Sequence, residues 1–377
     1  MKVSVLQENL AQGLNIVSRA VSPRSTLPVL ANVLVATDEG RLRLSATNLE
    51  LGITCWIGAK INEEGSTTVP ARTFTDLVTT LPNGHVDMDL TIRTQTLNVH
   101  SGTSNTDIKC IDAQEFPPMP TPDESQGVEF KMTDLRQMIH QVAFAASHDD
   151  ARPVLTGVLL NVADGQLTLA AADGFRLSVR TAELPKSAEA SINAIIPARA
   201  LNELARVAGD GDESVSMTIP PGRGQVTFRL KDIELTSQLI EGNFPEYQQI
   251  IPTGFNTRTV ISTEAFLKAC KQAEIFAREG SHIARLNITP GDDQQLGSVE
   301  ISAQSEETGS SEVVVDATVE GQPVLVAFNV RFLREVLDVI STPNVALETS
   351  AAAAPGVIRP IADDTFLHVI MPMHLGN

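Results

Sequence analysis

The chain has few residues of the kinds that usually perform covalent or metal chemistry. Its three cysteines are far apart and show no C-x-x-C spacing, which is typical of isolated thiols in a reducing compartment. Its seven histidines show no H-E-x-x-H pattern, and we find no G-x-x-x-x-G-K-[ST] phosphate loop and no G-x-S-x-G elbow. The sequence therefore predicts a non-catalytic protein without a metal or another cofactor.

Aromatic residues, long apolar runs and basic charge are also scarce. Only 4% of the residues are aromatic, so the cores must consist mainly of Val, Leu, Ile and Ala. No apolar run approaches ~18 residues, and the first residues contain no secretory h-region. The net charge of −18 argues against non-specific binding of nucleic acid or membrane by the surface as a whole. We expect a soluble cytoplasmic protein. Its basic residues could attract nucleic acid only where they form a local stripe.

The feature that the chain does have is a threefold repeat. An apolar residue that opens a helical pattern, a leucine twenty positions later, an arginine and a closing proline recur in that order. The three sets are Leu10, Leu30, Arg72 and Pro117, then Leu135, Leu155, Arg199 and Pro245, then Phe266, Leu286, Arg331 and Pro372. A period of roughly 126 residues is the size of a domain. We predict three similar domains, copy 1 (1–122), copy 2 (127–252) and copy 3 (253–377), that build a ring or an arc.

Each copy is expected to run strand, helix and three strands, twice over. The first helices carry single apolar stripes, namely Leu10, Leu14, Val17 and Val21, then Leu135, Ile139, Val142 and Ala146, then Phe266, Cys270, Ala273 and Ala277. Strands are predicted at Leu27–Val35, Arg152–Leu160 and Ile283–Ile288, with hairpin turns at Asp38–Gly40 and Asp164–Gly165. The fold class is α+β, with two helices packed on one face of antiparallel sheet in every copy.

Arginines recur on these helices. Arg72, Arg199 and Arg331 fall in register at the start of the second helix of each copy, so helices that face one way would form a basic surface for phosphates. Glu203 and Glu335 on the same helices weaken that surface. An alternative comes from His148, Asp149, Asp150 and Asp173, since clustered carboxylates can hold a divalent metal. This alternative predicts a carboxylate-dependent metal hydrolase.

Several motifs together resemble one family. They are Leu27-Pro28-Val29-Leu30, Ala46-Thr47-Asn48-Leu49-Glu50, Val69-Pro70-Ala71-Arg72, Ala172-Asp173-Gly174-Phe175-Arg176-Leu177, Phe244-Pro245-Glu246-Tyr247 and Val369-Ile370-Met371-Pro372-Met373. In this order they are similar to the bacterial DNA polymerase III beta subunits, the sliding clamps, over nearly the whole chain. The resemblance implies a head-to-tail homodimer, a ring of six domains that encircles duplex DNA as a processivity factor for DNA replication. A duplicate clamp for resistance or repair has the same pattern and remains open as an alternative.

The resemblance also implies three sets of site residues. Arg24, Arg72, Arg152, Arg199 and Arg206 would face DNA without reading its sequence. Ile275 and Phe276 of one protomer would meet the region of Leu77 in the other. A pocket, here called the partner-peptide pocket, would bind short linear motifs of the polymerase III alpha subunit, the clamp loader and repair polymerases. Its residues would be Leu155, Ala172, Phe175, Arg176, Leu177, Pro245, Ile250, Val369, Met371, Pro372 and Met373.

Overall fold

The computed structural model describes residues 1–23, 25–119, 127–184, 191–209, 211, 213–220, 222, 224–278, 281–292 and 295–374. The chain divides into two compact units, unit 1 with residues 1–135 and 200–239, and unit 2 with residues 136–199 and 240–377. Neighbouring strands pair in antiparallel fashion in both units. No helix among the described residues is long and apolar enough to span a membrane.

Every copy follows the predicted order of strand, helix and three strands, twice over. Copy 1 contains β1 (Lys2–Leu6), α1 (Gln7–Val17), β2 (Asn32–Asp38), β3 (Arg41–Thr47), β4 (Leu51–Glu63), β5 (Ser66–Pro70), α2 (Ala71–Thr80), β6 (His85–Thr91), β7 (Thr96–Ser101) and β8 (Ser104–Lys109). Copy 2 contains β9 (Val128–Lys131), α3 (Met132–Val142), β10 (Gly157–Ala163), β11 (Gln166–Ala172), β12 (Arg176–Glu183), β13 (Ile192–Pro197), α4 (Ala198–Val207), β14 (Ser214–Thr218), β15 (Gln225–Arg229) and β16 (Ile233–Gln238). Copy 3 contains β17 (Thr257–Ser262), α5 (Thr263–Ala277), β18 (Ile283–Thr289), β19 (Gly297–Ser305), β20 (Gly309–Gly321), β21 (Val324–Asn329), α6 (Val330–Asp338), β22 (Asn344–Thr349), β23 (Gly356–Pro360) and β24 (Phe366–Ile370).

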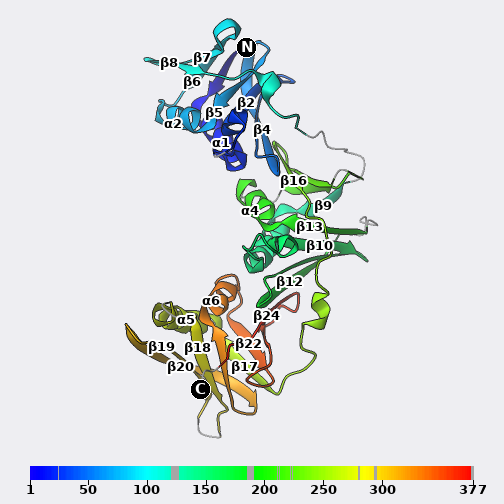
Figure 1. The fold of residues 1–377 in the computed structure, drawn as a ribbon, viewed down its shortest axis with the longest axis vertical. Coiled ribbons are helices and arrows are strands. Elements are labelled where there is room, and N and C mark those ends of the chain that lie inside the picture. The colour runs from blue at the N-terminus through cyan, green and yellow to red at the C-terminus, as the bar shows by residue number, and fades with distance from the viewer. Residues whose placement is uncertain are drawn as a thin grey trace. The chain divides into compact units, whose positions relative to one another are not determined.

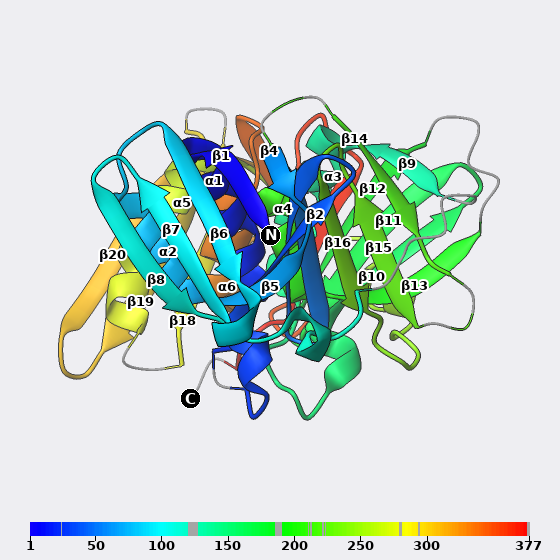
Figure 2. The same ribbon diagram turned by 90° about the horizontal axis from the view of Figure 1, so that it is seen from above.

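The apolar stripes of the helices face the sheets. In unit 1, α1 packs beside α2 and against β4, and in unit 2, α5 packs beside α6 and against β19 and β20 (Figures 1 and 2). Leu10 and Leu14 of α1 and Phe266 of α5 are fully buried, because residues three and four apart share one helix face. The predicted apolar stripes include Val21 and Ala146, but the helices end before them. Both residues lie beyond the ends of α1 and α3 and have extended backbone conformations.

The predicted strands at Leu27–Val35 and Arg152–Leu160 begin too early. Pro28–Ala31 and Pro153–Thr156 form 3-10 helices, because a proline at the first helical position has the required φ and needs no donor there. The repeat leucines Leu30 and Leu155 therefore lie in 3-10 turns, whereas Leu286 lies in strand β18 as predicted. The two hairpin turns are confirmed.

Strand pairing joins successive copies of the repeat. Strand β4 of copy 1 pairs with β16 of copy 2 in unit 1, and β12 of copy 2 pairs with β24 of copy 3 in unit 2. The same hydrogen bond closes both junctions. The Gln238 amide donates to the Glu50 carbonyl at 2.8 Å, and the Met371 amide donates to the Phe175 carbonyl at 2.8 Å. The two junctions are thus built alike, although their side chains differ.

The cores reflect the composition of the chain. The scarce phenylalanines are used inside, since Phe74, Phe228, Phe266, Phe328 and Phe366 are among the largest fully buried side chains. All three cysteines are free, Cys55 and Cys270 being buried and Cys110 half-buried. Burial raises the pKa of the Cys55 thiol to about 11, so this thiol is a neutral packing group at neutral pH.

Candidate functional site

Strand pairing at the β12–β24 junction brings together three residues that were expected in the partner-peptide pocket. Leu177 lies opposite Ala172 on one side and opposite Val369 on the other. All three side chains are buried in one apolar cluster, against which Tyr247 packs. These residues form the apolar base of the site, and their order in the sheet follows from alternation of side chains along antiparallel strands.

Other pocket residues present their side chains at the surface. Phe175 is 57% exposed, Ile250 is 41% exposed and Met371 is 38% exposed, and each lies within three residues along the chain of a residue that belongs to or packs against the buried cluster. Leu155 is half-buried in the 3-10 turn that precedes β10, and Pro245 precedes the short 3-10 helix Tyr247–Gln249. Pro372 and Met373 follow β24 and are half-buried. The structure therefore offers a buried apolar base with exposed Phe, Ile and Met beside it.

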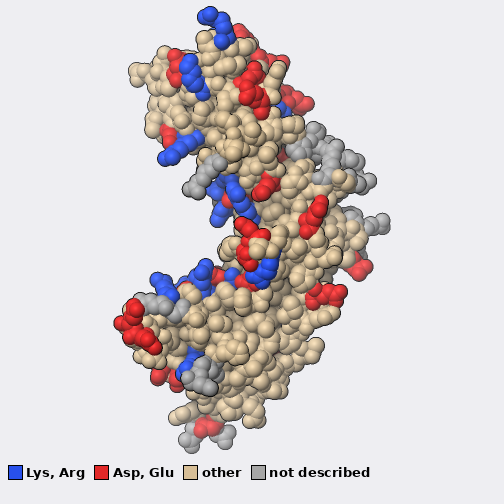
Figure 3. All heavy atoms as spheres, viewed as in Figure 1, with Lys and Arg blue, Asp and Glu red and all other residues tan. Residues whose placement is uncertain are grey.

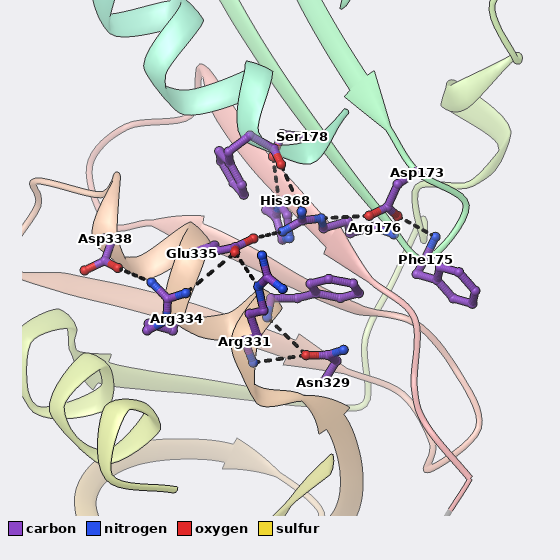
Figure 4. A network of polar contacts seen from close by, with 12 residues as sticks. Asp173, Phe175, Arg176, Ser178, Asn329, Arg331, Arg334, Glu335, Asp338 and His368 are labelled. Atoms are coloured by element: carbon purple, nitrogen blue, oxygen red, sulfur yellow. Dashed lines mark hydrogen bonds and ion pairs between the residues drawn. The ribbon is translucent and has the colours of Figure 1, made fainter. Parts of the chain in front are cut away.

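Arg176 differs from the other pocket residues because its charged group faces inward (Figure 4). The residue is only 7% exposed. Its guanidinium donates to Asp173 at 3.0 Å, to Glu335 of α6 at 2.5 Å and to the Phe144 carbonyl at 2.9 Å. The rings of Phe144 and Phe332 lie 5.3 and 4.2 Å from it. Arg176 is thus a positioning residue that links the β11–β12 turn to α6 rather than a free donor for a ligand.

The Glu335 carboxylate beside Arg176 is held in its charged form. Burial raises the pKa of Glu335, but hydrogen bonds from Arg176 and Arg331 lower it more, so this pKa lies below its usual range. Asp173 also accepts from the Phe175 and Arg176 amides at 2.8 and 3.0 Å. The turn that carries the exposed Phe175 is therefore fixed by backbone and side-chain bonds to the same carboxylate.

A hollow of about 530 Å³ adjoins this network. Phe175, Arg176 and Arg152 line it from copy 2, and Arg331, Phe332 and Glu335 line it from α6. It therefore brings one expected DNA-facing residue, Arg152, close to two expected pocket residues. The sequence assigned these residues to separate sites.

Most of the expected DNA-facing arginines lie at helix ends or in turns. Arg72 and Arg199 are exposed second residues of α2 and α4, as Arg331 is in α6. Arg206 lies in the last turn of α4, and Arg152 precedes the 3-10 turn Pro153–Thr156. Arg24 lies outside the described residues. In unit 2, lysine and arginine side chains gather over α5 and α6, with acidic side chains among them (Figure 3).

An acidic residue follows each recurring arginine one helical turn later; Glu203 and Glu335 were expected from the sequence to weaken the basic surface, and Asp76 was missed. Arg72 pairs with Asp76 at 3.8 Å, and Arg331 pairs with Glu335 at 2.9 Å. In α4, Glu203 instead pairs with Arg19 at 3.1 Å and with Arg206 at 2.9 Å. The sequence does contain a sign of these pairs, because an acidic residue follows each of the three arginines by four positions. At this spacing, side chains on one face of a helix meet. These acids partly neutralise the basic surface.

Two of the three carboxylates proposed to bind a metal pair with arginine instead. Asp149 accepts from Arg152 at 3.1 Å, as Asp173 does from Arg176. A hydrogen bond from the Ala151 amide, with that of Arg152, lowers the pKa of Asp149. In the part of the chain that the structure describes, no three His, Cys, Asp or Glu residues are grouped so as to hold a metal ion. The metal-hydrolase alternative is therefore not favoured.

The residues expected at a dimer contact lie on two helices. Leu77 is half-buried on α2 in unit 1. On α5 in unit 2, Ile275 is 58% exposed, while Phe276 is half-buried against the core. The sequence did not identify the sheet edges near these helices, because a strand's unpaired side becomes visible only once its pairing is known.

Family models for the DNA polymerase III beta subunit match the chain in three successive segments. The N-terminal domain model matches residues 1–120, the central domain model residues 129–246 and the C-terminal domain model residues 248–374. These matches follow the order of the three copies in the sequence.

Whole proteins are similar over the full length. The beta sliding clamp of Synechococcus elongatus is 32% identical, with all of both chains covered, and that of Bacillus subtilis is 30% identical, with 99% of each covered. The crystal structure of the Bacillus subtilis sliding clamp matches with a TM-score of 0.94 at 28% identity, covering all of both chains. The beta subunit structure from Pseudomonas aeruginosa matches with a TM-score of 0.91 at 28% identity, again over all of both chains.

Proposed function

This chain belongs to the family of DNA polymerase III beta subunits, the beta sliding clamps, and on that premise we propose that it encircles duplex DNA and tethers polymerases to it. As a sliding clamp it is a non-catalytic replication protein. The three copies would be clamp domains with the boundaries 1–122, 127–252 and 253–377. A closed ring retains DNA by topology, so moderate phosphate attraction is enough and tight contacts would only slow sliding.

The tethering site in this proposal is the partner-peptide pocket. The observation that carries it is the set of exposed Phe175, Ile250 and Met371 around a buried apolar base. Such a surface suits apolar anchors of extended peptides, and the flexible methionine can adapt to different sequences. Peptides of the polymerase III alpha subunit, the clamp loader and repair polymerases are the proposed occupants, and Arg176 would act by holding the turn at Phe175.

Replacement of Met371 tests this pocket. We expect Met371→Ala to weaken binding of a synthetic peptide with Leu and Phe anchors by about tenfold or more, as for a central interface residue. Fluorescence polarisation measures the affinity. The matched control is Leu325→Ala, because Leu325 is exposed to a similar extent, 45%, on β21 of the same unit. Equal affinity of the Met371 and Leu325 variants would contradict the pocket.

The proposed ring requires a junction between two protomers, and two strands have unpaired sides. Among the described residues, β8 pairs only with β7, and Gly309–Asp316 of β20 pair only with β19. By their order in the copies, β8 corresponds to β16 and β24, and β20 corresponds to β4 and β12. These are the strands that form the internal junctions. We infer that β8 of one protomer pairs with β20 of the next, near Leu77 and Ile275.

The internal junctions also specify a register. Val5 and Ile261 occupy the same place before α1 and α5, and they pair with Ala59 and Ala317 respectively. The β4–β16 register can be applied to β20 and β8 once these equivalent positions are aligned. It then places Thr106 opposite the partner's Ser311. Asp76 and Arg72 of α2 would then lie beside copy 3 of the other protomer, which supplies new charged neighbours.

Cysteine cross-linking tests this register. In a Cys110→Ser background, we expect Thr106→Cys with Ser311→Cys to form an intermolecular disulfide in high yield, because opposed residues in antiparallel strands lie about 4.5–5.5 Å apart. Non-reducing electrophoresis measures the yield. The control pair, Thr106→Cys with Val314→Cys, is three residues out of register. Equal yields, or none for the first pair, would contradict the assignment.

A further inference from the structure

Unit 1 contains a groove of about 200 Å³ at the β4–β16 junction. We call it the linker groove, and define it by Thr47, Glu50, Gly52, Thr236 and Gln238 together with Met119 from the segment that follows copy 1. All these residues belong to unit 1.

The linker groove is the structural counterpart of the partner-peptide pocket. Gly52 lies opposite Thr236 as Leu177 lies opposite Val369. The hydrogen bond from Gln238 to Glu50 matches the one from Met371 to Phe175. The copies therefore generate the same backbone frame twice in one chain.

The side chains of the linker groove have the opposite chemistry. Thr47 replaces Ala172, Glu50 replaces Phe175, and Thr236 replaces Val369, while Gln238 replaces Met371. Gly52 replaces Leu177, so the apolar base of the pocket is missing here. These substitutions remove the surface that would attract apolar anchors of a partner.

Met119 fills the space that Gly52 leaves. A Cβ atom added at Gly52 would lie 2.7 Å from the Met119 Cε and 3.5 Å from its Sδ. Met119 also packs against the buried cluster of Val29, Leu30 and Phe116. A methionine suits this role, because its unbranched side chain fills irregular gaps.

We propose that the β4–β16 junction is an intramolecular binding site covered by the segment Pro117–Met119, and that the linker groove is the space that remains beside this segment. Met119 thereby closes the counterpart of the partner-peptide pocket, so each protomer has one site for partner peptides instead of two. The number of peptide sites per protomer, one, rests on the proposed function of the partner-peptide pocket. The position of Met119 does not depend on that function.

A double-mutant cycle tests the occupancy. Gly52→Ala should lower the thermal unfolding midpoint in the unchanged chain and should lower it clearly less in a Met119→Ala background, because the clashing atoms are gone. The control is Gly58→Ala on the same strand, where an added Cβ meets nothing within 4 Å. Met119→Leu, which shortens the side chain but keeps it apolar, is used if the alanine variant does not fold. Equal losses in both backgrounds overturn the proposal.

Peptide stoichiometry tests the closure. Isothermal titration uses a synthetic peptide with Leu and Phe anchors. With Thr47→Ala, Glu50→Phe, Thr236→Val and Gln238→Met, which restore the corresponding side chains of the partner-peptide pocket, we expect one peptide per protomer while Met119 is present, and two when Met119→Ala makes room for Gly52→Leu. One peptide in both variants, or two in the unchanged protein, overturns the closure. If the peptide binds to none of the variants, the partner-peptide pocket is contradicted. The double-mutant cycle then still tests whether Met119 occupies its place over Gly52.

Discussion

A single histidine makes the stability of unit 2 depend on pH. His368 is fully buried, stacks on Phe144 and shares a 2.6 Å hydrogen bond between its Nδ1 and the Ser178 hydroxyl. Burial, with the charge of Arg176, lowers the pKa of His368 from 6.5 to about 3. Below pH 6.5 the unfolded chain therefore binds a proton that the folded chain does not. The contribution to stability is complete above pH 6.5 and falls by up to about 1.4 kcal/mol per pH unit toward pH 3.

Urea unfolding between pH 7.5 and 5 measures this slope. His368→Gln keeps a polar group near Ser178 but cannot titrate, so it should have a shallower pH dependence than the unchanged protein. The carboxylates Asp173 and Glu335 are present in both proteins and cancel in the comparison. Identical slopes would show that His368 is not the titrating group.

At the scale of elements, the link from the β11–β12 turn to α6 should depend on Arg176. Arg176→Met removes a buried guanidinium and leaves the half-buried Glu335 and Asp173 without their common partner, at an expected cost of about 3–5 kcal/mol. Addition of Glu335→Gln should recover part of this loss. The control is Arg331→Met, since Arg331 pairs with the same Glu335 but its side chain is 52% exposed, so about 0–1 kcal/mol is expected. Chemical unfolding measures the costs, and equal costs for both arginines would contradict the link.

The periodic elements could be predicted from the sequence, and the connections between them could not. Apolar spacing located α1 and α5, and positive φ at Glu39 and Gly40 agrees with the predicted hairpin turn. The 3-10 turns at Pro28 and Pro153 were missed, because Leu27–Val35 and Arg152–Leu160 are apolar enough to resemble strands. The inward direction of Arg176 was missed as well, since Phe144 and Glu335 approach it only through the fold.

For the whole molecule, the repeat in the sequence predicts more than the number of domains. Two internal junctions have the same strand register, and within the described part of the chain β8 and β20 retain the unpaired sides that a third junction of this kind needs. Because the net charge is −18, attraction of phosphates must come from local groups of basic side chains, such as those over α5 and α6 (Figure 3). Retention on DNA should therefore depend on closure of the ring rather than on the strength of contacts.

Release from DNA tests this account most directly. The Thr106→Cys, Ser311→Cys protein would be placed on nicked circular DNA by a clamp loader, oxidised, and followed by gel filtration before and after the DNA is cut once. We predict that the protein stays on the circle in high salt and leaves within minutes of linearisation, because it slides off the free ends. Equal retention on circular and linear DNA, or loss from the circle in high salt despite the cross-link, would contradict encirclement.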